Sequence, residues 1–475
     1  MAFGPFVRIE RWCSLMSRYT IKRKMGGNVA YDFLRLYVPL FIGATLFAIY
    51  LGERMTGSSF TTLGIVGFVL FISILFWRLE IAILLLLVMR TGLDMFRDVN
   101  IPLLGSSGRL NPAAIIAFTI SAFGICYILA RRINIFKMPI SCPYLLFLII
   151  AFSTIIISPD KILSIREWSR FLSIYVLYIL VAGTIKNDRD IKRVVQAIFI
   201  SSIVPLAVGS YQIFAGGGQY DWMARVTRIN ATFASSNGYA AYLAMFLIVV
   251  IVFTLYSRST LKSICFLLMA GVMLMNLYFT YTRAPIVGCI VAIIVVGALK
   301  NKKVWIALLF VAMLAYFLPT LLGRFNLLLS RSTYEAGSLA WRFRLWEMTI
   351  GLVKSSPLVG RGPATFSVEA HNDYLRFLVE YGAFGLIAII WMIAVLFKEG
   401  LEVFKKSSSS FHQMIALSFI AVLASHTVMA LGSNSSFRPV TSWYLFSLGA
   451  VVHRVLRNER SKKDRNRRKA RILTN

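Results

Sequence analysis

Charged residues are scarce in this chain, and acidic residues are the scarcest of them. Asp, Glu, Lys and Arg make up 15% of its 475 residues, whereas 58% are hydrophobic. A mean hydropathy of +0.72 is too high for a soluble globular protein. The short alternating segments of a membrane β-barrel are also absent. Instead, the chain carries apolar runs of roughly 17–21 residues, each long enough to cross about 30 Å of hydrocarbon.

Cysteine and histidine are sparse too. The five cysteines have neither metal-ligand spacing nor the pattern of a disulfide framework, and we predict that all five serve packing; they are Cys13, Cys126, Cys142, Cys265 and Cys289. One Asp-x-Asp sequence occurs, at Asp188 and Asp190. The topology below assigns it to the cytoplasm, away from the candidate site, so we predict no metal and no cofactor.

The formal net charge of +31 comes from 51 basic residues against 20 acidic ones. Cytoplasmic loops of membrane proteins collect Lys and Arg, so this charge does not require a nucleic-acid partner, and we predict none. The basic stretch Arg457–Arg471 is expected to be a solvated tail or one that faces lipid headgroups. No small-residue cleavage site follows the first apolar run, which predicts a retained span.

The apolar runs predict an all-α polytopic membrane protein with about 12–14 transmembrane helices. Fourteen spans are expected, near 34–52, 60–77, 79–96, 112–130, 139–157, 169–185, 194–214, 238–256, 264–282, 284–299, 304–322, 382–397, 411–431 and 441–456. With the N-terminus inside, every inner loop is rich in Lys or Arg, as the positive-inside rule requires.

This topology divides the chain into five segments. They are a basic cytoplasmic N-terminus (1–33), transmembrane helices with outer loops that include 215–237 (34–322), a large extracytoplasmic loop with short helices (323–381), C-terminal transmembrane helices (382–456) and a basic cytoplasmic tail (457–475). A long polar loop held by many spans is where a membrane enzyme would keep its catalytic residues.

Lysine and arginine are distributed differently across the predicted membrane. Of seventeen lysines only Lys161 and Lys354 fall outside, whereas sixteen of thirty-four arginines do. Arg binds phosphate bidentately, and Lys is only a point charge. Retention of Arg therefore favours an anionic, phosphorylated ligand; headgroup anchoring, or pairing with outer carboxylates, is the alternative for each single arginine.

His371 is the one histidine of four that this topology places in an outer loop among carboxylates and arginines. A histidine can accept a proton near neutral pH, and Glu369 or Asp373 could orient it. After His371, the sequence predicts an amphipathic helix on the membrane surface, with Arg376 and Glu380 paired at i,i+4.

Arg283 lies between two apolar runs. A charged residue there predicts a functional site, with snorkelling at a span junction as the alternative. Arg225 and Arg228 precede another span, in a second outer loop.

Three stretches together are similar to the O-antigen ligase/polymerase family of bacterial membrane glycosyltransferases. They are Arg228 followed by Thr-Phe-x-x-x-Asn, the Thr-Arg-x-x-x-x-Gly stretch at 282–288, and the 341–375 stretch with Trp-Arg-x-x-Leu-Trp, Ser-Pro-Leu-Val-Gly-x-Gly-x-x-x-Phe and His-Asn-x-Tyr-Leu. The resemblance covers roughly 220–400. Ala231 and Ser236 stand where the family often has Gly and Pro.

The resemblance implies a metal-independent, inverting enzyme that uses an undecaprenyl-diphosphate-linked glycan at the outer face of the bacterial inner membrane. Its expected catalytic residues are His371, Arg283 and Arg228. We expect substrate contacts from Arg225, Arg342, Arg344, Asn372, Arg376 and Asn237. Membrane lipids would surround the spans.

The acceptor stays open between another lipid-linked glycan, for a polymerase of O-antigen or exopolysaccharide, and lipid A core, for a ligase. We slightly favour the polymerase, because it does not require a host with lipid A. A transporter or flippase of a polyanionic lipid-linked glycan is the alternative from another class. It would need charges in mid-span positions and would leave His371 without a role.

Overall fold

The computed structural model describes residues 59–96, 101–102, 109–110, 112–221, 226–300, 338–363, 365 and 371–474. The predicted spans near 34–52 and 304–322 lie outside the described residues, and so do Arg225, Glu369 and Cys13. Within the described ranges, helices account for nearly all regular structure, which confirms the predicted all-α class.

Twelve of the fourteen predicted spans fall on described helices, and the one near 194–214 is divided between two. The helices are α3 (Ser59–Trp77), α4 (Leu79–Met89), α5 (Pro112–Ala130), α6 (Ser141–Ser153), α7 (Lys161–Thr184), α8 (Asp188–Ser201), α9 (Ile203–Ala215), α10 (Ser236–Tyr256), α11 (Thr260–Phe279), α12 (Arg283–Leu299), α15 (Ser338–Ser355), α16 (Asp373–Lys406), α17 (Ser410–Met429) and α18 (Pro439–Thr474). Short 3-10 turns cover Leu93–Phe96 and Ile135–Lys137.

Two small antiparallel hairpins interrupt the helices. In one, β1 (Ile101–Pro102) pairs with β2 (Arg109–Leu110). In the other, β3 (Gln219–Asp221) pairs with β4 (Val226–Arg228), so that Gln219 lies opposite Arg228.

The chain is a multi-pass membrane protein. Among the described residues, six helical stretches are long and apolar enough to cross a membrane, namely Ala113–Ala130, Asp188–Ala215, Ser236–Tyr256, Thr260–Phe279, Asp373–Lys406 and Ser410–Met429. Several shorter helices, among them α6 and α12, are apolar as well. The full number of spans stays a prediction.

The chain divides into two compact units. The smaller comprises the chain up to Leu86 together with Ala122–Asn134, and the larger comprises Leu87–Ser121 and everything from Ile135 onward. In the smaller unit, the rings of Phe76 and Phe123 meet edge to face with centroids 5.0 Å apart. All the described candidate site residues belong to the larger unit.

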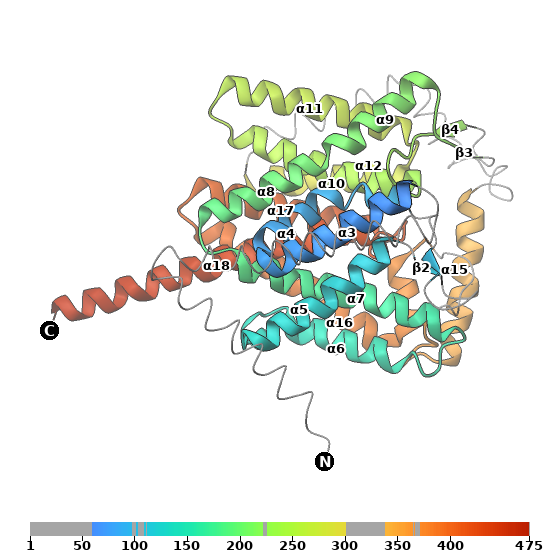
Figure 1. Cartoon of the computed structure of the whole chain (residues 1–475), viewed down its shortest axis with the longest axis horizontal. Helices are drawn as coiled ribbons and strands as arrows, with labels where there is room; N and C mark the ends of the chain where they lie inside the picture. Colours follow the sequence, from blue (N-terminus) through green and yellow to red (C-terminus); the bar gives the residue numbers. More distant parts are fainter. Residues whose placement is uncertain are drawn as a thin grey trace, which may run out of the picture. The chain divides into compact units, whose positions relative to one another are not determined.

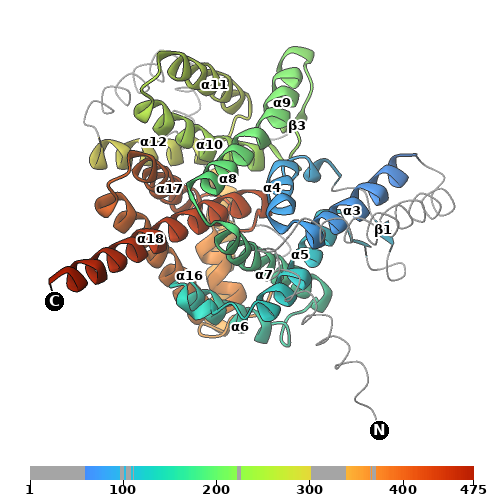
Figure 2. The ribbon, with the colours of Figure 1, turned by 60° about the vertical axis from the view of Figure 1, so that its left-hand side comes forward.

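Helices α10 and α17 form the centre of the larger unit. In each, 78% of the most apolar window is buried, against 22% in α11. α10 packs on α11, α12 and α17, whereas α7 packs on α18 and α6 packs on α16 (Figures 1 and 2). α11 is therefore a peripheral helix whose apolar surface faces lipid.

The starts of several helices follow from capping residues. Asp160 caps α7 by accepting from the Leu163 N–H, and Ser235 caps α10 by accepting from Gly238 N–H. Asn187 and Asp190 form a reciprocal capping box at the start of α8. At the other end of α9, Gly216 has φ +70°, the left-handed conformation that glycine adopts without cost.

α16 is broken at Gly382, which has φ +67° and ψ −173°. The segment 357–362 supplies the hydrogen bonds that the break leaves open. The carbonyls of Pro357 and Leu358 accept from residues 383 and 384, and the N–H groups of Arg361 and Gly362 donate to residues 379 and 380. The backbone of the Ser-Pro-Leu-Val-Gly-x-Gly motif thus supplies hydrogen-bond partners at the break in α16.

The cysteine prediction is correct only in part. Cys289 is buried in α12, whereas Cys126, Cys142 and Cys265 are exposed on apolar helices, and all four are free thiols. These three cysteines lie on the exposed sides of their helices.

Candidate functional site

Arg228 is the most highly connected side chain of the candidate site. Its Nη1 donates to Asp221 Oδ2 at 2.8 Å, across the β3–β4 hairpin. Its Nη2 donates to Asn237 Oδ1 and Thr282 Oγ1, both at 2.7 Å, and its Nε donates to the Thr280 carbonyl at 2.8 Å. One guanidinium therefore joins the hairpin, the start of α10 and the turn between α11 and α12.

The side chain of Gln212 in α9 hydrogen-bonds to the loop between β4 and α10. Gln212 Oε1 accepts from the N–H groups of Asn230 and Ala231, and Gln212 Nε2 donates to Asn230 Oδ1. This amide sets the path that carries the chain from Arg228 to Asn237. Asn237, a predicted substrate contact, hydrogen-bonds directly to Arg228, a predicted catalytic residue.

Arg283 is the first residue of α12 and has an exposed side chain. The residue before it, Thr282, donates to Asn237 Oδ1 at 3.2 Å as well as accepting from Arg228. Arg228 and Arg283 are thus brought to the same turn, although 54 residues separate Arg228 from Thr282.

Arg342 of α15 supplies a third guanidinium. Its Nη1 donates to the Gly432 carbonyl at 3.2 Å, in the loop that follows α17. Burial lowers the pKa of Arg342, and the positive charges of Arg283 and Arg228 lower it further. The three arginines therefore share one region of positive potential, which favours an anion.

His371 directly precedes α16 and is half-buried. Its φ is +51°, a backbone conformation that few non-glycine residues adopt and in which His is enriched. The Asn372 side chain caps α16 by accepting from the Leu375 N–H at 3.1 Å. Asn372 was predicted as a substrate contact, but the geometry favours a structural role as helix cap.

Asp373 fastens the start of α16 to the 430–438 loop. Its Oδ2 accepts from the Ser436 N–H at 2.7 Å and the Ser435 hydroxyl at 3.2 Å, and its own N–H donates to the Ala430 carbonyl at 2.8 Å. The carboxylate that was expected to orient His371 therefore holds this loop instead. Arg342 hydrogen-bonds to Gly432 of the same loop. The 430–438 loop therefore contacts both the start of α16, next to His371, and the arginine cluster formed by Arg228, Arg283 and Arg342.

The predicted i,i+4 pair of Arg376 and Glu380 is confirmed, with Nε 2.8 Å from Oε1. Their helix is packed into the bundle, and its predicted position at the membrane surface stays a prediction. Its residues Asp373, Phe377 and Glu380 are buried, and the Arg376 guanidinium lies 3.7 Å above the Phe437 ring. The apolar stripe predicted a surface helix, but the bundle covers it because Phe377 packs on Phe147 and Phe437.

Arg170 of α7 completes this buried group of charges. It forms an ion pair with Glu167 and donates to the Phe437 carbonyl at 2.8 Å. The guanidinium groups of Arg170 and Arg376 thus both lie at the Phe437 ring, and each is paired with a glutamate. Arg376 is thus held by Glu380 and the Phe437 ring, and its predicted substrate contact stays a prediction.

The two remaining predicted contacts are not joined to the cluster by the described geometry. Arg344 is exposed on α15, two residues from Arg342 and hence on a different face of that helix. Arg225 lies outside the described residues.

Left-handed backbone is concentrated in the site segments. Among the described non-glycine residues, four have positive φ: Arg132, Ala231, Tyr281 and His371. Ala231 lies between Arg228 and Asn237, and Tyr281 lies in the turn that Arg228 bonds. Such conformations cost free energy and persist where the surroundings enforce them, as at functional sites.

The Asp-x-Asp sequence is engaged elsewhere. The Asp190 carboxylate accepts from the backbone N–H groups of Lys186 and Asn187, and Asp188 Oδ1 lies 3.1 Å from His412 Nε2. A second carboxylate, Glu459 Oε1, lies 3.1 Å from His412 Nδ1. These contacts join α8, α17 and α18 and involve none of the candidate site residues.

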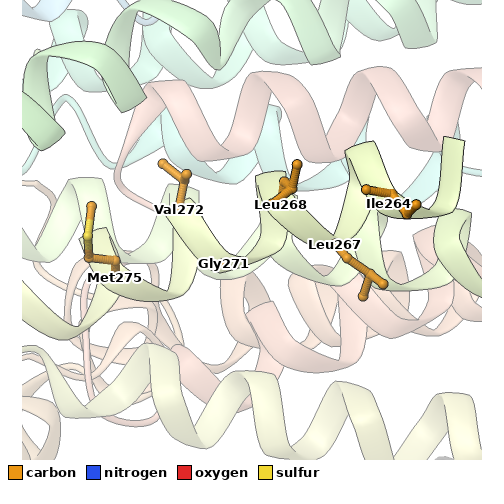
Figure 3. A pocket seen from close by; sticks show the side chains of 6 residues that line it. All are labelled: Ile264, Leu267, Leu268, Gly271, Val272 and Met275. Carbon is orange, nitrogen blue, oxygen red and sulfur yellow. The ribbon is translucent and has the colours of Figure 1, made fainter. Parts of the chain in front are cut away.

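An apolar groove of about 440 Å³ runs along α11, lined by Ile264, Leu267, Leu268, Gly271, Val272 and Met275 (Figure 3). None of these side chains can bind an anion or transfer a proton. The groove is therefore part of the lipid-facing surface of α11 and not the site of chemistry.

Sequence reasoning missed the 430–438 loop, which touches α7, α10, α15 and α16. Arg438 was counted among the outer arginines but was not placed in the site. The available signal was the polar sequence Gly-Ser-Asn-Ser-Ser between two apolar runs, which resembles an ordinary connecting loop.

Residues 268–390 match the family model described as O-antigen ligase. The matched segment contains Arg283, Arg342 and His371 but neither Arg228 nor Asn237. No curated protein matches the chain in a sequence comparison.

Proposed function

We propose that this chain, whose residues 268–390 match the O-antigen ligase family model, transfers a glycan from undecaprenyl diphosphate to an acceptor hydroxyl at the outer face of the bacterial inner membrane. The observation that carries the proposal is the shared support of Arg228, Arg283, Arg342 and the His371 segment. That arrangement provides an anion site beside a potential base.

In the proposed reaction, the bond between the anomeric carbon and the diphosphate oxygen breaks, and the diphosphate leaves with the electron pair. Arg283 and Arg228 neutralise the charge that develops on it. The acceptor oxygen forms the new glycosidic bond from the opposite face, so the anomeric centre inverts. His371 takes the proton that the acceptor hydroxyl loses.

The placement of the site supports the outer face. In Figure 1, β3, β4 and α15 lie at the end of the larger unit away from the C-terminus. The C-terminal end of α18 is the strongly basic stretch that the positive-inside rule assigns to the cytoplasm. A site at the opposite end would face the periplasm, where lipid-linked glycans are presented.

The acceptor in the proposed reaction is a sugar hydroxyl. Either a second lipid-linked glycan or a lipid A core offers a sugar hydroxyl to His371, and we slightly favour polymerisation. Transport is less consistent with the geometry, because the arginines gather at helix ends and hairpins instead of along a central path.

The test is glycan transfer by purified protein in vesicles supplied with a polyprenyl-diphosphate-linked glycan. We expect His371→Ala and Arg283→Ala each to reduce the rate at least about 100-fold, since a positioned base or a charge-stabilising donor contributes that much. Arg166→Ala is the matched control, because the Arg166 side chain is exposed on α7 and none of the contacts described above involves it.

Normal transfer by both site variants at equal protein level would overturn these roles. Movement of the lipid-linked glycan across the vesicle membrane without any new glycosidic bond would favour the transporter. Offering lipid-linked glycan and lipid A core separately distinguishes polymerase from ligase.

A further inference from the structure

The start of α16 is hydrogen-bonded to the end of α17. The carbonyls in the last turn of any α-helix have no partner within that helix. At the end of α17, the Thr427 carbonyl accepts from Tyr374 Oη at 2.8 Å. The next exposed carbonyl, that of Ala430, accepts from the Asp373 N–H at 2.8 Å. Two consecutive residues of α16 therefore satisfy the end of α17.

The Asp373 side chain adds a third connection between the same two helix ends. Its Oδ2 accepts from the Ser436 N–H, and the Ser436 hydroxyl lies 3.3 Å from Nε2 of His426, in the last turn of α17. Asp373 is 1% exposed and His426 is 7% exposed. Polar groups buried this deeply are costly to leave without hydrogen bonds, so these bonds hold the two helix ends together.

Helix α12 packs closely on the same end of α17 (Figure 2). A Cβ atom at Gly288 would lie 2.6 Å from Ser425 Oγ and 2.7 Å from Met429 Cγ, closer than such atoms can rest. The two helices approach this far because position 288 is glycine. Gly288 lies five residues after Arg283, the first residue of α12, which is about 7.5 Å along the helix axis. The end of α17 therefore also holds the start of α12.

We infer that the end of α17, residues 425–430, sets the distance between His371 and Arg283. Asp373 and Tyr374 are then positioning residues, which act on His371 through the short backbone segment that joins them. The inference rests on the proposed function, in which His371 takes a proton on one face of the anomeric carbon and Arg283 stabilises the diphosphate that leaves from the other. The φ of +51° at His371 persists only where its surroundings enforce it, and the bonded end of α17 supplies such surroundings.

The experiment measures a single turnover of glycan transfer by the full chain in vesicles, started after a polyprenyl-diphosphate-linked glycan has bound. Because only donor-bound protein reacts, loss of folded protein does not change the measured rate. Tyr374→Phe removes only the hydroxyl that bonds Thr427. We expect it to slow transfer roughly 10- to 100-fold, because a misplacement of about 1 Å has an effect of that size, with the Kd of the donor changed less than about threefold.

Asp373→Ala should slow transfer by a similar factor. Asp373→Asn should recover part of the rate, because its amide oxygen can still accept from the Ser436 N–H.

Two matched controls separate positioning from general stability. Tyr444→Phe also removes a tyrosine hydroxyl that donates to a backbone carbonyl, that of Leu87 at 2.5 Å, but it should transfer at the rate of the natural protein. Gly288→Ala should slow transfer at least about 10-fold, because the new methyl group pushes α12 away from α17. Gly271→Ala, on α11, meets nothing within 4 Å and should leave the rate unchanged.

A distance measurement tests the inference without any reaction. Spin labels attached at His371→Cys and Arg283→Cys, in a chain without its native cysteines, should give a narrow distance distribution by electron paramagnetic resonance. Adding Tyr374→Phe or Gly288→Ala should broaden the distribution or shift its mean by about 1 Å or more, whereas adding Tyr444→Phe should not.

The inference and the proposed function can fail separately. Natural rates and an unchanged distance in Tyr374→Phe and Gly288→Ala, with transfer still lost in His371→Ala, reject only the inference. Equal losses of rate in Tyr374→Phe and Tyr444→Phe also overturn it, because the loss of any buried hydrogen bond would then slow transfer. A distance that depends on Tyr374 and Gly288, in a protein that transfers no glycan, rejects only the function.

Discussion

At the scale of single residues, the site depends on backbone conformations that its amino acids do not prefer. Ala231, Tyr281 and His371 all have φ near +50°. Each flanks a residue that the site uses, and Gln212 and Arg228 hold the first two segments through the hydrogen bonds described above. The two positions at which the sequence departs from the family resemblance have conformations that suit Gly and Pro. Ala231 occupies a position suited to Gly, and Ser236 is the first residue of α10, a position that accepts Pro.

Ala231→Gly is expected to raise the free energy of unfolding by about 0.5–1 kcal/mol. Glycine relieves left-handed strain of roughly 1–2 kcal/mol and gives back part of that gain through its larger entropy when unfolded. The measurement is reversible unfolding of the purified protein by denaturing detergent. Ala394→Gly, at an exposed position inside α16, should lower stability by about 1 kcal/mol. A destabilised Ala231→Gly protein would contradict the assigned strain.

At the scale of elements, the structure is organised around the break in α16. The short first part of this helix carries the histidine segment and the buried Arg376–Glu380 pair, and the long second part continues as a span. Backbone groups freed inside a membrane protein must find partners, and the segment 357–362 provides them. The break lets the first part turn toward the 430–438 loop, to which Asp373 binds it.

Gly382→Ala should lower the free energy of unfolding by about 3 kcal/mol or more. A Cβ atom at this position would lie 2.1 Å from the Leu358 carbonyl oxygen, and the φ of +67° adds strain for any residue but glycine. Detergent unfolding and the yield of folded protein are the readouts. Gly271→Ala, where the new methyl group meets nothing within 4 Å, should be neutral or slightly stabilising. Similar stability of the two variants would show that the break in α16 does not need glycine at position 382.

At the scale of the whole molecule, the large unit separates its two charged regions. The arginine cluster lies at one end, and the basic end of α18 extends from the other (Figure 1). Arg228, Arg283 and Arg342 repel one another, so their proximity requires stabilisation by an anion or by neighbouring dipoles. Under the positive-inside rule, the basic end of α18 predicts that this end of the large unit lies in the cytoplasm and that the arginine cluster lies outside.

This orientation predicts opposite labelling of two single-cysteine variants built on a chain without its native cysteines. Ser355→Cys, at the exposed end of α15, should react with a membrane-impermeant maleimide added to cells whose outer membrane has been opened. Ser461→Cys, exposed on α18, should react only after the inner membrane is permeabilised. The reverse pattern would place the arginine cluster in the cytoplasm and reject the proposed reaction.

The apolar runs of the sequence were enough to predict an all-α membrane protein, which the described helices confirm, and twelve of the fourteen predicted spans fall on described helices. The residue types of the site stay a prediction. A long apolar run predicts a membrane span because exposing it to water costs free energy. Arg residues retained where Lys is rare predict a phosphate ligand, because the planar guanidinium can bind phosphate bidentately. Only the tertiary structure decided which polar residues meet. Thr280, Thr282 and Asn237 hydrogen-bond to Arg228, Asn372 caps α16, and the Arg376 guanidinium lies over the Phe437 ring. Such contacts join segments tens to hundreds of residues apart, and their energies depend on distance and burial that no local pattern encodes.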